Sequence, residues 1–580
     1  MIGQNIILDA QTNYSSSIPR FNTSYKFPLN ISFLGFNKSV VDVNYLNEYL
    51  PKWHSPIIRS LSIQYGRVIS AINYTLDYTY TFLNQEQLNG YEEFMALNSL
   101  NDLPPDYISR KSANYIPSDM AENYIKTNFM GNSPTLFIIN TYNGSVEAPH
   151  YYYSQPYQFQ QSSSTEITGG GHNSRFIWLD LSAGPTKYMD FDLWYNSNPL
   201  NGVNETLVPP IWKYNFTKNE YNLSFMNNLI KYIRTAIELK FLPSYDVETA
   251  HPIKKFKLQF IEIKTVDSIT DLFKYIDKEA IQQKYSEINP NVEWEYDTLS
   301  WDWKQNEKFA SLLQNARDET TKLYDDRQFV SFFDNYYNQI VDSKTNDIFV
   351  IPIFLLILPD NYRFIWNASS QNVAGKSAYI LFPINAENYN TYFNLPISFC
   401  TAILMHEIGH AIGLNHPFDG YSWTVPTSQY DYNYQYWLWD FTYTQMSYVG
   451  IHQDIAKMDI DTLQRGAVIS YATMIRDNII HYINENKGNL STRQNEILSQ
   501  IRAGYKEIEP IFENVTNSFN YQTALQMMYK LIHKWSDFIQ TSSNIDKTII
   551  LLISSALLII FVIIIKVRKK IHTSSSESKL

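Results

Sequence analysis

The sequence predicts an α+β protein built from several units, with one membrane-spanning helix. At 580 residues and 67.9 kDa, the chain is too long for one compact domain. Strand and helix patterns are mixed up to about residue 460, helical patterns follow, and an aliphatic run lies near the C-terminus. We therefore expect an N-terminal mixed α/β domain, a central domain with a mixed twisted sheet and a long helix, a C-terminal helical stalk and one transmembrane helix.

Composition excludes several classes of protein. Hydrophobic residues make up 44% of the chain and charged residues 18%, which favours a folded protein over a disordered one. The net charge of −11 is spread along the chain without a basic patch, so we expect no nucleic-acid partner. Cys400 is the only cysteine, so no intramolecular disulfide can form, and we expect a small buried core residue there.

The N-terminal part divides into an exposed leader and a mixed domain. Residues 1–30 are polar and predict the leader, and residues 31–245 mix strand and helix patterns. Apolar runs at 135–139 and 175–179 predict buried strands, and helical spacing over 225–241 ends before a proline. This domain could be a prodomain, a substrate-binding module or a spacer.

A glycine-rich segment lies between those two predicted strands. Gly169, Gly170 and Gly171 precede His172, and we expect a flexible loop whose histidine is more often solvated than bound to a ligand. We find no catalytic group of residues in this domain.

Residues 251–460 predict the central domain. Polar and apolar residues alternate over 255–263, as in a half-buried strand. The remaining patterns, in order, are helices at 268–285 and 304–340, an apolar central strand at 347–358, a strand at 377–382 and a helix at 397–412.

Three of the 11 histidines fall within eleven residues at the end of that last helix. His406 and His410 are four apart and so share one helix face, while Glu407 stands beside the first of them. Gly413 can take the positive φ that ends a helix, which would bring His416 back toward the same ion. Three histidines leave one tetrahedral zinc position open, as in catalytic sites. A buried helix with hydrogen-bonded histidines is the simpler alternative.

A second motif follows at 445–448, where the sequence is Gln-Met-Ser-Tyr. The pattern H-E-x-x-H-x-x-G-x-x-H with a following Met-turn resembles the metzincin clan of zinc endopeptidases. The resemblance implies Zn²⁺ held by His406, His410 and His416, with Glu407 as the general base. It further implies that Met446 forms an apolar base beneath the histidines and that Tyr448 assists the oxyanion.

The resemblance implies a function and a place for the substrate. We expect an endopeptidase that cleaves proteins or peptides, with residues 377–382 either as the sheet edge that pairs with substrate or as an ordinary core strand. The alternative is a non-enzymatic surface or envelope protein with a structural zinc site. The intact Glu407 favours the enzyme, because a structural site has no need of that carboxylate.

Residues 461–546 predict a helical bundle or stalk. Ser491 and Gln494 form a capping-box pattern, and apolar residues between Leu525 and Ile539 recur at helical spacing.

Residues 548–565 are almost uniformly apolar, which predicts a transmembrane helix. Four basic residues begin the tail 566–580, so we expect a cytoplasmic tail and an extracellular remainder at the cell membrane. Twelve N-x-S/T sequons agree with a glycosylated exterior, whereas the start at Met1 lacks the pattern of a signal peptide. The composition resembles that of an archaeal cell-surface protein.

Overall fold

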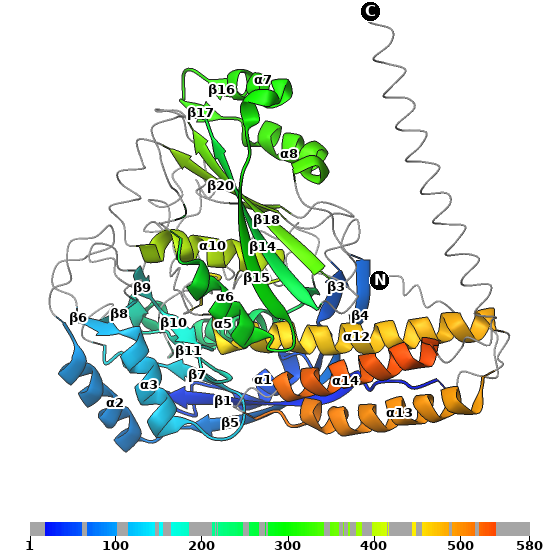
Figure 1. The fold of residues 1–580 in the computed structure, drawn as a ribbon. Coiled ribbons are helices and arrows are strands. Elements are labelled where there is room, and N and C mark those ends of the chain that lie inside the picture. The colour runs from blue at the N-terminus through cyan, green and yellow to red at the C-terminus, as the bar shows by residue number, and fades with distance from the viewer. Residues whose placement is uncertain are drawn as a thin grey trace, which may run out of the picture.

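The computed structural model shows a mixed α/β protein (Figure 1). It describes residues 18–60, 67–100, 114–144, 150–154, 164–184, 211–214, 216, 219–247, 254–265, 273, 276–340, 348–358, 364, 369–371, 379–385, 397–414, 416, 444–447, 455–486, 490–516 and 521–540.

The N-terminal part is built on a six-stranded sheet with the order β10-β11-β7-β1-β5-β2. The four inner strands run parallel and the two outer strands antiparallel. The strands are β10 (Thr168–Gly170), β11 (Phe176–Asp180), β7 (Thr135–Ile139), β1 (Ser24–Leu34), β5 (Asn73–Phe82) and β2 (Trp53–His54). The predicted strand at 135–139 is confirmed with the same bounds, and the one at 175–179 is confirmed one residue later. Both are buried along their whole length, as parallel strands covered on two faces are.

Two smaller sheets and several helices complete this part. The small sheets have the orders β12-β8-β6, with β9 on β8, and β13-β3-β4. Their strands are β12 (Ala183–Gly184), β8 (His150–Ser154), β6 (Asn114–Pro117), β9 (Ser164–Glu166), β13 (Tyr245–Val247), β3 (Ile57–Ser60) and β4 (Arg67–Ala71). The helices are α1 (Val43–Tyr49), α2 (Gln85–Asn98), α3 (Ser118–Phe129), η1 (Ile211–Lys213) and α5 (Asn219–Ala236), which continues into the π-helical turn η2 (Ile237–Phe241).

The predicted flexible loop at Gly169–Gly171 is wrong, because these glycines are packed tightly. Gly169 and Gly170 belong to β10, and Gly170 and Gly171 have φ of 103° and 82°. A Cβ on Gly169 would lie 2.6 Å from the Trp178 indole, and one on Gly170 would lie 2.3 Å from the carbonyl oxygen of Phe176. Glycine is needed here for close approach of the backbone to its neighbours.

The central unit (residues 254–455) has a five-stranded sheet with the order β15-β14-β18-β20-β19. All pairs are parallel except β19 with β20. The strands are β15 (Glu293–Ser300), β14 (Lys255–Lys264), β18 (Ile348–Leu358), β20 (Tyr379–Asn385) and β19 (Ser369–Gln371), and a separate hairpin pairs β16 (Arg317–Asp318) with β17 (Leu323–Tyr324). The prediction that 347–358 forms the sheet centre is confirmed by β18.

Helices cover both faces of the central sheet. They are α6 (Lys278–Ile288), η4 (Trp303–Gln305), α7 (Glu307–Asn315), α8 (Asp326–Ile340) and α10 (Ile397–Ala411). One apolar cluster joins α6 and α10 to the sheet and contains the buried Cys400, and a second joins α7 and α8 to the other face. The helical stretch predicted at 304–340 is confirmed in part: it contains α7 and α8, and the β16–β17 hairpin lies between them.

The predicted substrate-pairing edge at 377–382 is also wrong. Its strand, β20, lies between β18 and β19, and Tyr379 to Phe382 are buried. The core-strand alternative therefore holds for these residues. The edge position next to them belongs to the antiparallel three-residue strand β19.

Three long helices follow the central unit, α12 (Lys457–Glu485), α13 (Thr492–Glu513) and α14 (Tyr521–Gln540). The capping box predicted at Ser491 is confirmed at the start of α13. Figure 1 shows α13 and α14 beside β1 and α12 beside α14, and apolar residues of all three helices share one core with the N-terminal strands. Residues 18–247 and 456–540 thus form a composite unit, and the central unit is inserted between its two halves.

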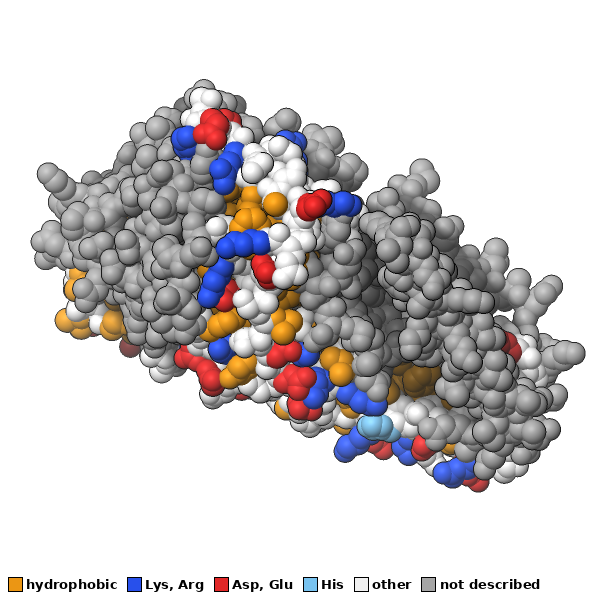
Figure 2. Space-filling view, turned by 45° about the horizontal axis from the view of Figure 1, so that its top comes forward, with side chains coloured by type: hydrophobic (Ala, Val, Ile, Leu, Met, Phe, Trp, Pro, Cys, Tyr) orange, Lys and Arg blue, Asp and Glu red, His pale blue; other side chains and the backbone are white. Residues whose placement is uncertain are grey.

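The transmembrane helix in the predicted fold class is not supported and is withdrawn. Within the residues that the structure describes, no helix is both long and apolar enough to cross a membrane. The predicted span 548–565 and tail 566–580 lie outside the described residues. The predicted cell-surface location then depends on the sequons and stays a prediction. On the face shown in Figure 2, acidic and basic side chains of described residues are interspersed among apolar ones.

Candidate metal centre

The three predicted histidines lie together at the C-terminal end of α10. One ring nitrogen from each of His406, His410 and His416 lies within 4.8 Å of the others. The Nε2 atom of His410 is 3.2 Å from that of His406 and 3.0 Å from that of His416. Tetrahedral zinc with Zn–N bonds of about 2.0–2.1 Å separates its nitrogen ligands by roughly 3.3 Å. The spacing of these nitrogens therefore fits one zinc ion.

The turn after α10 brings His416 back, as the sequence predicts. Gly413 has a φ of 108°, and its N–H donates to the His410 carbonyl at 3.0 Å. The Leu414 N–H donates to the Gly409 carbonyl at 2.8 Å. A glycine in the left-handed region ends the helix in this way because a side chain would be strained there.

Two backbone carbonyls fix the orientation and the tautomer of the helical histidines. His406 Nδ1 lies 2.8 Å from the Gln445 carbonyl oxygen, and His410 Nδ1 lies 2.7 Å from the Leu414 carbonyl oxygen. A carbonyl only accepts, so each Nδ1 carries the proton and each Nε2 presents a lone pair. Such outer hydrogen bonds are typical of histidines that bind metal. The Nε2 lone pairs of His406 and His410 therefore lie close together, where both can bind one cation.

Burial keeps His406 in the neutral form that binds metal. His406 is buried, and His410 and His416 are half-buried. Burial, followed by the neighbouring His410 and His416, holds the pKa of His406 well below its usual value. Glu407 directly follows His406 on α10 and is 7% exposed.

The Met-turn packs beneath the helix that carries the histidines. Thr444 to Ser447 are buried, and the Ser447 N–H donates to the Thr444 carbonyl at 3.0 Å. Met446 is fully buried, and a Cβ on Gly409 would lie 2.5 Å from its Sδ. The structure thus brings Met446 against α10 between the two helical histidines. Tyr448 lies outside the described residues.

Two supporting contacts could not be read from the sequence. The Tyr285 hydroxyl of α6 donates to the Met405 carbonyl, one residue before His406. The Thr444 hydroxyl of the Met-turn donates to Asp459 in the first turn of α12. Both join residues distant in sequence. The only local signal is the acidic residue at a helix N-terminus, which is common in any protein.

We expect the stability of the fold to depend on pH through the buried Asp459 carboxyl. Burial raises its pKa to about 6, against the lowering effects of the Thr444 hydroxyl and of Lys240. A raised pKa means that the folded state holds the proton more tightly than the unfolded state does. The protonated Asp459 carboxyl therefore stabilises the fold fully at a pH below the ordinary pKa of an aspartate, and this contribution is lost as the pH rises through about 6. We expect Asp459→Asn, which is always neutral, to gain stability relative to wild type as the pH rises from about 4 to about 7.

Chemical denaturation of both proteins across this pH range, with the same chelator present, measures the difference. A difference in the free energy of unfolding that stays constant with pH would contradict the assignment.

A family model described as a domain of unknown function (DUF7906) matches residues 25–193, which begin in β1 and end after β12. No curated protein matches the chain. The histidine motif and the Met-turn lie outside the matched residues.

Proposed function

We propose that this protein is a zinc-dependent endopeptidase. The observation that carries the proposal is the convergence of three histidine nitrogens, with Glu407 next to the first ligand. The Nδ1 atoms of two of these histidines, His406 and His410, are hydrogen-bonded to backbone carbonyls. The resemblance to metzincins supports the same reading from the sequence. His406, His410 and His416 would hold the zinc.

Each residue of the site would have a separate role in peptide hydrolysis. Bound zinc would supply a Lewis acid that polarises the scissile carbonyl and lowers the pKa of water toward neutrality. Glu407 would take the proton from the attacking water and pass it to the leaving amine. Tyr448 keeps its proposed role as a donor to the developing oxyanion. Met446 would support the histidines from below without touching the substrate.

The zinc itself provides the first test. We expect the purified chain to bind one zinc per molecule and to hydrolyse an unfolded protein such as reduced casein in a chelator-sensitive way. His416→Ala should release the zinc, because two histidines hold the ion much more weakly than three. Elemental analysis measures the zinc content after dialysis.

His481→Ala is the matched control, since this histidine is exposed on α12. An unchanged zinc content in His416→Ala would remove that ligand from the site.

The alternative is a non-enzymatic protein with a structural zinc. This alternative predicts the same zinc content but no hydrolysis. Removing the zinc from the protein would then lower only its melting temperature. Activity that survives complete metal removal would contradict both readings.

A further inference from the structure

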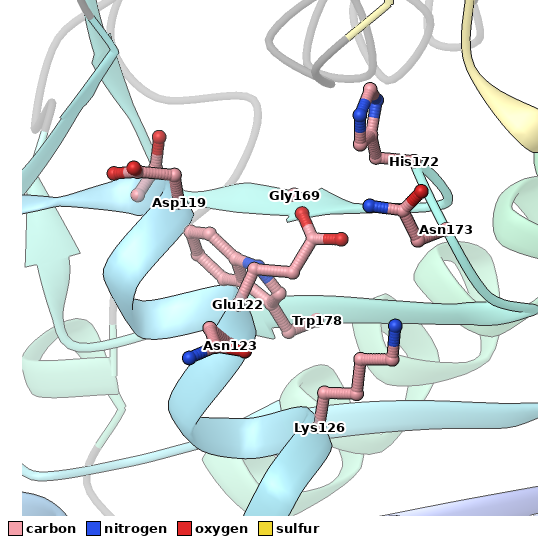
Figure 3. Close-up of a pocket in the computed structure, with 9 residues that line it drawn as sticks. Asp119, Glu122, Asn123, Lys126, Gly169, His172, Asn173 and Trp178 are labelled. Carbon is pink, nitrogen blue, oxygen red and sulfur yellow. The ribbon is translucent and has the colours of Figure 1, made fainter.

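A polar pocket lies in the N-terminal half of the composite unit, between α3 and the β10–β11 hairpin (Figure 3). Its volume is about 200 Å³, and none of its lining residues belongs to the candidate zinc site. The side chains and backbone that matter here are those of Asp119, Glu122, Lys126, Gly169, Asn173 and Trp178. Pockets for drug-sized ligands hold roughly 300–1,000 Å³, so this one suits a single small ring.

The floor of the pocket offers a buried hydrogen-bond donor. Trp178 is fully buried, and its indole N–H has no acceptor among the residues that the structure describes. Gly169 presses on the indole so closely that a Cβ there would lie 2.7 Å from the ring nitrogen. An indole N–H can only donate, and a buried donor without an acceptor is costly. An acceptor atom of a ligand that reaches this N–H would satisfy it, as a water molecule would when no ligand is bound.

The walls offer both donors and acceptors with nearly balanced charge. Asp119, Glu122 and Lys126 come from α3, and Figure 3 shows Asn173 on the opposite side with its side chain turned toward Glu122. Burial raises the pKa of Glu122 to about 7, with Lys126 acting against the shift and Asp119 adding to it. At neutral pH this carboxyl is thus present in both forms and can accept or donate.

Charged ligands match this set poorly. A cation would meet the Trp178 N–H and the Lys126 ammonium, and an anion would meet the Asp119 carboxylate. Within the described part of the chain, the residues placed to hold a metal ion are the three histidines of the zinc site. A hydroxyl group both donates and accepts, so it can pair with each of these side chains.

We propose that this pocket binds an uncharged polyol of monosaccharide size, with one ligand oxygen accepting from the Trp178 N–H and further hydroxyls pairing with Glu122 and Asn173. The site is separate from peptide hydrolysis. It gives the N-terminal half a binding role of its own.

Calorimetric titration of the full chain tests the proposal. The probes are D-glucose, D-mannose, D-galactose and N-acetyl-D-glucosamine, with glycine as a zwitterion and acetate as an anion. We expect saturable binding of at least one sugar at one site per chain and no binding of glycine or acetate. Glu122→Ala and Asn173→Ala should each weaken that binding roughly tenfold or more, because each removes hydrogen bonds to the ligand.

Matched controls are Glu92→Ala and Asn335→Ala, exposed residues of α2 and α8 outside the pocket. Both should bind the sugar as wild type does, and the melting temperature of every variant shows whether it folds. Asn173 is exposed, so its truncation leaves the core intact.

Three results would overturn the proposal: no sugar binds, a sugar binds equally well to both pocket variants, or glycine or acetate binds in place of sugar. Zinc content and casein hydrolysis are measured on the same samples, so failure here is distinguishable from failure of the proposed peptidase.

Discussion

Glu407→Ala should retain zinc and fold but lose peptide hydrolysis by about 10²–10⁴-fold, the usual contribution of a positioned general base. The carboxylate stands next to His406 on α10 but is not among the three grouped nitrogen ligands, so its removal leaves the metal site intact. Glu407→Gln should lose as much activity, because an amide cannot accept the proton. The initial rate of hydrolysis of an unfolded protein, normalised to bound zinc, measures the loss.

Glu279→Gln serves as the matched control, since this glutamate lies in the first turn of α6 and interacts with the Tyr296 hydroxyl. It should hydrolyse the substrate at the wild-type rate. Equal rates for wild type and both Glu407 variants would remove the proposed general base. The structural-zinc alternative requires instead that no variant, wild type included, shows zinc-dependent hydrolysis.

Asp461→Asn should destabilise the composite unit by about 3–5 kcal/mol, because it removes the carboxylate from a buried ionic cluster. Arg175 follows the glycine-rich turn and lies 2.7 Å from Asp461 of α12, and both side chains are less than a tenth exposed. Arg465 lies 3.8 Å from the same carboxylate and is almost fully buried. Two buried guanidinium groups would then face a neutral amide.

Denaturant unfolding at constant zinc concentration measures this effect. Glu496→Gln is the control, since its ion pair with Arg493 is exposed on both sides, and its removal should change the free energy of unfolding by less than about 0.5 kcal/mol. Similar midpoints for Asp461→Asn and wild type would mean that the cluster contributes little to the union of the two halves. A double variant with Arg175→Met measures the coupling between the two partners.

The grouping of the three histidines could be predicted from the sequence because their arrangement is local. An i, i+4 pair on one helix and a glycine three residues later fix where three side chains point. The carbonyls that orient them could not be predicted, since Leu414 and Gln445 contribute backbone atoms that any residue carries. Periodicity likewise placed β7, β18 and α10, whose apolar patterns are unambiguous.

Errors arose where pairing or packing decides the structure. The sheet-edge role predicted for 377–382 failed because β19, only three residues long, pairs outside β20 and carries no pattern of its own. Gly169 to Gly171 looked flexible because glycine serves both loops and close contacts. Trp178 and Phe176 contact Gly169 and Gly170, whereas Gly171 is contacted by Met458 of α12, which is distant in sequence. Sequence spacing alone does not separate those two uses.

The insertion of the central unit has a consequence for how the chain is made. Apolar residues of β1 share a core with α13, which the ribosome delivers 458 residues later (Leu34 to Thr492). The central unit supplies most residues of two further cores and can begin to fold as soon as it has emerged. During that interval the first half must remain incompletely buried, and such exposed surface is prone to aggregation. During synthesis the central unit therefore folds before the N-terminal half of the composite unit can complete its core.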